Sequence, residues 1–134
     1  MSFEEAIATQ PTWIQIWVSW MGIAILGTMT ALAFSKPTRQ DSLIILAVTV
    51  PMYFAMMWLY DQFGYVRLLG IVHVVLWTPL AIYLWQRLKN AAIVTPFRQV
   101  IWILLATILI SLAFDYADVV RYVLGERGSM VPAG

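Results

Sequence analysis

Long stretches without a charged side chain are the feature that most constrains this chain. No charge occurs between Glu5 and Lys36, and the continuously apolar part of that stretch ends at Phe34. A helix that crosses a bilayer needs about 20 predominantly apolar residues. The stretch therefore predicts a first membrane span over residues 12–34. We expect it to be a retained span and not a cleaved signal peptide, because the acidic N-terminus lacks the basic region of such peptides.

Three further apolar stretches follow at similar spacing. They predict a second, third and fourth span over residues 42–60, 66–86 and 99–118. Pro51 and Pro79 lie inside the second and third spans. Proline is tolerated in a membrane helix when neighbouring groups satisfy the freed carbonyl, so both helices are expected to kink without breaking.

The fourth stretch is short for a bilayer, because it is interrupted at Asp115. At helical spacing Asp115, Asp118 and Tyr122 share one stripe, and valines fill the opposite face. We therefore expect an amphipathic extension of this helix to about residue 124. The following residues 126–134 are rich in Gly, Ser, Pro and Ala and are expected to form a flexible tail.

Composition agrees with a membrane protein. The chain is 62% hydrophobic and 11% charged, whereas a soluble domain has about 45–50% apolar and about 25% charged residues. Together with the four spans, this predicts an all-α, polytopic membrane protein in which residues 1–134 form one four-helix bundle. A net charge of +1 without a continuous basic stripe makes nucleic acid an unexpected partner. The absence of cysteine excludes disulfides, thiolate nucleophiles and Cys-ligated metal centres.

The basic residues of the loops predict how the protein is oriented. One side of the predicted membrane holds more of them than the other, and cytoplasmic loops usually carry the excess of Lys and Arg. The richer side has Lys36, Arg39, Arg87, Lys89 and Arg98, and the other has Arg67, Arg121 and Arg127. Both termini are therefore predicted to be non-cytoplasmic. The membrane is predicted to be a bacterial inner membrane.

Tryptophans form a regular stripe at the start of the first span. Trp13, Trp17 and Trp20 recur at i, i+4 and i+7 and so share one helix face. The favoured interpretation is an aromatic belt at the membrane interface. The alternative is a flat surface on which the ring of a haem, quinone or pigment stacks.

His73, in the third span, is the only histidine of the chain. Ionisable groups inside membranes are functional candidates, so His73 is a candidate ligand for haem iron or pigment magnesium, or a proton relay. A haem with two histidine ligands would need a second copy or a partner subunit. The competing interpretation is a neutral imidazole that is hydrogen-bonded inside the bundle.

Charged residues gather at the predicted non-cytoplasmic end of the bundle. With the histidine, they define a candidate site for an ion, a proton or a polar ligand. The members are Asp61, Arg67, His73, Asp115, Asp118 and Arg121. The favoured interpretation is simpler, because charges commonly end apolar runs and Asp118 and Arg121 have the i,i+3 spacing of an ion pair.

Methionines and small residues add weaker signals. Met52 and Met56 share a helix face, but methionine is an ordinary core filler and no metal site is predicted. Gly27 and Ala31 form a small-xxx-small pair, and Gly70 is a further point of close helix approach.

Three functional hypotheses remain from the sequence. The leading one is a small membrane subunit without catalytic chemistry that self-associates or binds a larger inner-membrane complex. The first alternative is a redox subunit that anchors haem, quinone or pigment through His73. The second is an oligomeric cation or proton channel or transporter that uses carboxylates in the outer leaflet. No nucleotide-binding loop, serine elbow or His-Glu-x-x-His motif occurs, so the sequence does not favour an enzyme.

Overall fold

Four long helices dominate the computed structural model, which describes residues 2–90 and 93–130. They are α2 (Thr12–Ala33), α3 (Arg39–Phe63), α4 (Gly70–Leu88) and α5 (Phe97–Val123). Three short helices, α1 (Phe3–Ala8), η1 (Lys36–Thr38) and η2 (Arg67–Leu69), accompany them. No strand occurs in the described residues, and all four long helices are long and apolar enough to cross a membrane. The predicted all-α four-helix membrane fold is therefore confirmed.

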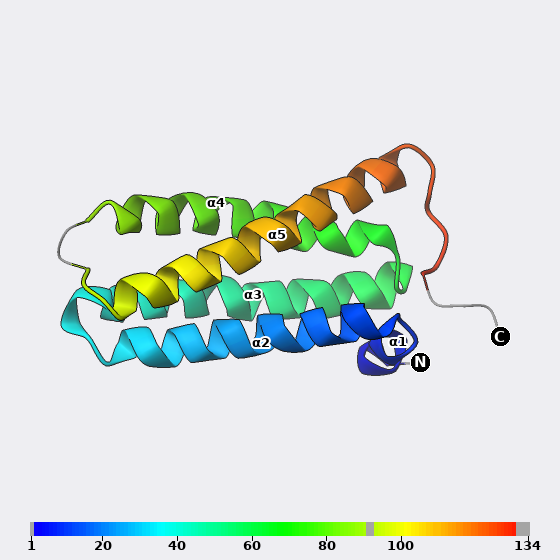
Figure 1. Ribbon diagram of the computed structural model, residues 1–134. Helices are drawn as coiled ribbons and strands as arrows, with labels where there is room; N and C mark the ends of the chain where they lie inside the picture. Colours follow the sequence, from blue (N-terminus) through cyan, green and yellow to red (C-terminus); the bar gives the residue numbers. More distant parts are fainter. Residues whose placement is uncertain (1, 91–92, 131–134) are drawn as a thin grey trace.

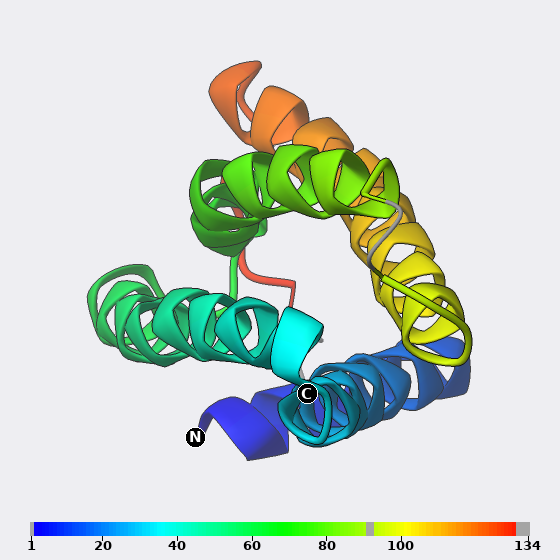
Figure 2. The same ribbon diagram turned by 90° about the vertical axis from the view of Figure 1, so that its left-hand side faces the viewer.

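The long helices are arranged so that each packs against the next one in the chain and α5 also packs against α2. Figure 1 shows α2 and α3 side by side, with α5 crossing the bundle obliquely, and Figure 2 views the bundle along its length. The most extensive contact joins α4 and α5. We call the end that holds α1 and residues 123–130 the terminal end, and the end with the α2–α3 and α4–α5 connections the loop end.

The helix bounds differ from the predicted spans at the start of α3. The second span was predicted to begin at residue 42, which left Asp41 outside it, but α3 begins at Arg39 and holds Asp41 in its first turn. A carboxylate there interacts favourably with the positive end of the helix dipole. Both α3 and α4 continue through Pro51 and Pro79, while the kinks there stay predictions.

The buried core is contributed mainly by α4 and α5. Its largest fully buried side chains on these helices are Trp77, Leu84, Ile101, Leu104, Leu105 and Ile108. From α3, Met52 is part of the core, and Met56 packs against it, as expected of a core filler. Most side chains of α2 and α3 face outward, which leaves two helices with large surfaces for lipid or another protein.

The terminal end is covered by the two ends of the described chain. α1 begins with the Ser2 Oγ accepting the Glu5 N–H at 3.1 Å, and the ring of Phe3 packs against Tyr65 at 5.9 Å between centroids. Met130 donates its backbone N–H to the carbonyl of Tyr65 at 2.8 Å. The described part of the predicted flexible tail thus contacts the α3–α4 turn, while its flexibility stays a prediction. Residues 131–134 of that tail lie outside the described residues.

Candidate functional site

Gly70 brings α4 and α5 together at the terminal end. A Cβ at this position would lie 3.3 Å from the Cα, the carbonyl oxygen and the Oδ1 of Asp115. Two of these atoms belong to the backbone, so only a glycine lets the helices approach this closely without a shift. The close approach predicted at Gly70 therefore occurs within the chain, and it holds Asp115 against the first turn of α4.

His73 lies one turn along α4 from this crossing and faces Asp115. Its Nδ1 is 3.9 Å from Asp115 Oδ2, and the two side chains are 17% and 18% exposed. That separation is too long for a direct hydrogen bond. The imidazole also packs edge-on against Trp77, with 4.7 Å between ring centroids. Trp77 is only 1% exposed, so the imidazole borders the core.

Arg67, in η2, forms the second layer of the site, closer to the terminal end. Its Nε is 3.6 Å from Asp118 Oδ1 and 3.6 Å from Glu126 Oε2. The ion pair of Asp118 therefore runs to Arg67, and the described residues contain no ion pair between Asp118 and Arg121. Glu126 was not among the predicted site residues, because it lies in the segment that the sequence assigned to the tail.

Three atoms of this site are buried without a hydrogen-bond partner. They are Arg67 Nε, His73 Nδ1 and Asp115 Oδ2. A buried polar atom without a partner costs about 1–3 kcal/mol. Such atoms mark a place where a polar ligand or water would improve the free energy of the folded protein.

Two predicted members of the site lie at its edge. Asp61 and Arg121 are exposed, and neither side chain forms a hydrogen bond or ion pair within the described residues, although the Arg121 guanidinium still acts on the Asp118 carboxylate through space. The Tyr65 phenol lies nearer to the site. Burial raises the pKa of Tyr65, and the Asp118 carboxylate raises it further, so the phenol stays protonated at neutral pH. The structure thus assembles His73 with Asp115, and Arg67 with Asp118, out of the predicted set.

The tryptophan stripe of α2 faces α5. The Trp17 indole donates to Ser111 Oγ at 3.1 Å, and the Trp20 indole donates to Thr107 Oγ1 at 3.0 Å. Trp17 and Trp20 are three residues apart in α2, and their partners are four residues apart in the antiparallel α5. Each pair therefore spans about one helical turn, so the two pairs can meet. The stripe thus fastens α2 to α5, a role that the aromatic-belt interpretation did not include.

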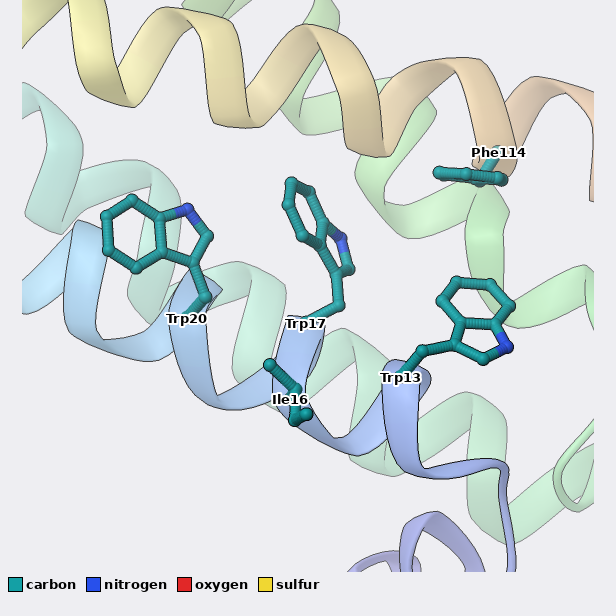
Figure 3. Close-up of a pocket in the computed structure, with 5 residues that line it drawn as sticks. All are labelled: Trp13, Ile16, Trp17, Trp20 and Phe114. Atoms are coloured by element: carbon teal, nitrogen blue, oxygen red, sulfur yellow. The ribbon is translucent and has the colours of Figure 1, made fainter.

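A shallow apolar groove of about 510 Å³ follows this stripe (Figure 3). It is lined by Trp13, Ile16, Trp17, Trp20 and Phe114. His73 is not among these residues, so the candidate cofactor residues His73, Trp13, Trp17 and Trp20 do not all line this groove. A joint haem, quinone or pigment site stays a prediction.

A second polar cluster, at the loop end, was missed by the sequence interpretation. Asp41 is fully buried, and its carboxylate accepts from Arg87 Nε at 2.8 Å, Arg87 Nη2 at 3.2 Å and the Tyr83 hydroxyl. Arg87 also donates to the carbonyl of Pro37 at 2.9 Å. We call Asp41, Tyr83 and Arg87 the loop-end clamp. Every oxygen of its carboxylate has a partner, which is typical of a structural ion pair.

Comparisons with known proteins add no functional assignment. No protein-family model matches the chain, and searches of curated proteins and of solved structures found no similar protein. A path for ions through a single chain is not supported. Between His73 and the loop-end clamp lie the buried apolar side chains of Trp77, Leu80 and Leu84.

Proposed function

We propose that the protein is a membrane subunit without catalytic chemistry of its own, and that it self-associates through α2. The observation that carries this proposal is an outward stripe with heptad spacing on that helix. The stripe consists of Thr12, Ile16, Ser19, Ile23, Leu26 and Thr30, all exposed. Alternating steps of three and four residues keep one face turned toward a second helix along its whole length.

Exposed apolar residues alone only indicate contact with lipid, so the small residues beside the stripe matter more. Gly22 and Gly27 flank it, and a Cβ on either would meet nothing within 4 Å. The chain therefore does not use these glycines for its own packing, although glycine in a helix costs about 0.5–1 kcal/mol relative to alanine. Small residues let membrane helices approach closely, which supports contact with another helix here.

The first half of the stripe itself lines a shallow, open groove of about 410 Å³. The lining residues are Thr12, Gln15, Ile16, Ser19, Trp20 and Ile23. Two copies inserted in the same direction would cross their α2 helices about a twofold axis along the membrane normal. In that arrangement Ile23, in the middle of the stripe, lies close to Ile23 of the second copy.

Cross-linking tests the self-association directly, because the natural chain has no cysteine. The Ile23→Cys variant is expected to form covalent dimers in membranes on mild oxidation. Ile110→Cys is the matched control, since Ile110 is a similarly exposed isoleucine on α5. Gly27→Leu in the Ile23→Cys background is expected to reduce cross-linking at least about tenfold, a loss of about 1.4 kcal/mol in association. Ala106→Leu, at an exposed site on α5, should not reduce it.

Equal cross-linking of the two cysteine variants, or none of Ile23→Cys, would contradict self-association through α2. Binding to a larger membrane complex in place of a second copy predicts monomers for every variant of the purified protein. Analytical ultracentrifugation in mild detergent separates these outcomes, because it measures the mass of the protein without a cross-linker.

The proposal also includes a bacterial inner membrane with both termini non-cytoplasmic, which rests on the distribution of Lys and Arg in the loops. A membrane-impermeant maleimide applied to spheroplasts is expected to label Ser2→Cys and to spare Ser35→Cys until the membrane is permeabilised. Ser2 precedes α1, and Ser35 lies in the α2–α3 connection at the opposite end. The reversed labelling pattern would show the opposite orientation.

A further inference from the structure

The polar cluster between α4 and α5 supports an inference beyond assembly. We propose that His73 and Asp115 form a proton-binding site, in which one water molecule bridges the two side chains and protons exchange with the aqueous phase at the terminal end. The proton bonds to the imidazole, and the resulting imidazolium lies beside the Asp115 carboxylate. The proton leaves a water molecule and bonds to the imidazole nitrogen, and no other bond is made or broken.

The distance between the two polar atoms fits a bridging water molecule. His73 Nδ1 and Asp115 Oδ2 are 3.9 Å apart, and both atoms are buried without a partner. A water molecule placed beside the line that joins them reaches each atom at about 2.8 Å. Hydrocarbon cannot satisfy these atoms at membrane depth, so a water molecule there removes the free-energy cost of leaving each of them unpaired.

The charges around the pair select a cation as the ligand. The Arg67 guanidinium lies beside the carboxylates of Asp118 and Glu126, and the Asp115 carboxylate lies beside His73. The Arg121 guanidinium also acts on Asp118. With the three carboxylates ionised, the two guanidiniums leave one negative charge in excess, and a positive ligand relieves it. A metal ion would need more ligands, and the described residues contain no group of three or more His, Cys, Asp or Glu that could hold one. A proton, unlike a metal ion, can be bound by His73 and Asp115 alone.

The exposed fractions of the side chains indicate the route by which protons reach the imidazole from the aqueous phase. The fraction falls from 59% at Glu126 to 35% at Asp118 and 27% at Arg67, and then to 18% at Asp115 and 17% at His73. Polar groups thus lead from the surface to the imidazole and stop there, because Trp77 closes the inner side. The site exchanges protons with one side of the membrane and is not part of a pathway across it.

The other groups near the pair have defined partners or lie outside it. α2 carries no titratable side chain, and α3 contributes Tyr60 and the exposed Asp61 at this end. The α3–α4 turn contributes the Tyr65 phenol, which stays protonated at neutral pH. On α5, the Tyr116 hydroxyl is hydrogen-bonded to Thr78 Oγ1 at 2.9 Å. The pair therefore differs from these groups in that its polar atoms face each other without contact.

Nuclear magnetic resonance of the imidazole tests the proposal, because His73 is the only histidine and gives one set of ring signals. The full chain, labelled with ¹⁵N-histidine and placed in lipid nanodiscs, is titrated from about pH 4 to about pH 9. The ring nitrogens are expected to show one protonation step. In Asp115→Asn the midpoint of that step is expected to fall by about one pH unit or more, because the imidazolium loses its counter-charge.

Asp61→Asn is the matched control, since it removes an exposed carboxylate at the same end, and it should leave the midpoint unchanged. An imidazole that does not titrate in the natural protein, or a midpoint that is the same in Asp115→Asn, overturns the proposal. Magnetisation transfer from water to the imidazole N–H, measured on the natural chain, tests the bridging water without any substitution. Its absence would also overturn the proposal, even if Asp115→Asn failed to fold.

Discussion

Replacing Asp41 by asparagine is expected to destabilise the bundle by about 3 kcal/mol, the size of effect seen when one partner of a buried ion pair is removed. The substitution keeps the shape of the side chain and removes its charge. Arg87, which donates to both carboxylate oxygens, is then left beside a neutral group near the boundary of the membrane. The expected result is a large loss of stability with little change in the fold.

The expected loss of stability depends on how deeply each residue of the clamp is buried. Asp41 has no exposed surface, while the Arg87 side chain is 25% exposed. Arg87 can therefore move its guanidinium partly toward water, which places the expected effect at the lower end of the range for buried pairs. The bond from Arg87 to the carbonyl of Pro37 also ties η1 to α4, so the α2–α3 connection should loosen first.

Reversible unfolding in mixed detergent micelles, followed by circular dichroism, measures this change. Asp61→Asn is the control, because it neutralises an exposed carboxylate of the same helix. The double variant Asp41→Leu with Arg87→Met is expected to recover most of the stability, since an apolar pair replaces both charges. A loss below about 1 kcal/mol, the usual worth of an exposed ion pair, would mean that the clamp is solvated in the membrane.

The two polar clusters of the bundle differ in a way that separates structure from candidate function. At the loop end every carboxylate oxygen of Asp41 has a donor. At the terminal end an imidazole nitrogen and a carboxylate oxygen face each other at 3.9 Å without a hydrogen bond. Satisfied buried networks rigidify a fold, whereas unsatisfied ones have capacity for a ligand. Only the second cluster therefore suggests binding.

Sequence patterns could predict the fold because membrane spans are specified by hydropathy and length. Backbone groups must be satisfied within each span, so an apolar stretch of sufficient length leaves helix as the only solution for a chain of this kind. The bounds were less predictable where charges enter a helix. Asp41 fell outside the predicted second span, because a charge usually ends an apolar stretch. The partner that compensates its charge inside the helix, Arg87, lies 46 positions away in the sequence.

The candidate site could be predicted only in part, for a related reason. His73, Asp115 and Asp118 were recognisable as ionisable groups at membrane depth, which is a property of the sequence alone. Their pairing depends on where α4 and α5 cross, and no periodicity specifies that point. A usable signal was present for the loop-end clamp, because Tyr83 and Arg87 are spaced i, i+4 at the end of a helix that is antiparallel to the one bearing Asp41.

Replacing Gly70 by leucine is expected to damage both the fold and the candidate proton site. A Cβ at Gly70 already lies 3.3 Å from backbone atoms of Asp115, so the larger side chain must push α4 and α5 apart. Overpacking of this kind costs about 1–3 kcal/mol. Because the crossing holds Asp115 opposite His73, the same displacement separates the pair. The imidazole titration should then resemble that of Asp115→Asn.

Gly27→Leu is the matched control, since a Cβ at Gly27 meets nothing within 4 Å. It should leave the unfolding free energy of the monomer and the titration of His73 unchanged, while reducing cross-linking through α2. If Gly70 acts only within the chain, Gly70→Leu should change the unfolding free energy and the titration of His73 but leave cross-linking through α2 unchanged. A Gly70→Leu protein that unfolds like the natural chain would mean that the helices separate at little cost, and Gly70 would then not be what positions Asp115. The two glycines thus distinguish packing inside one bundle from packing between two.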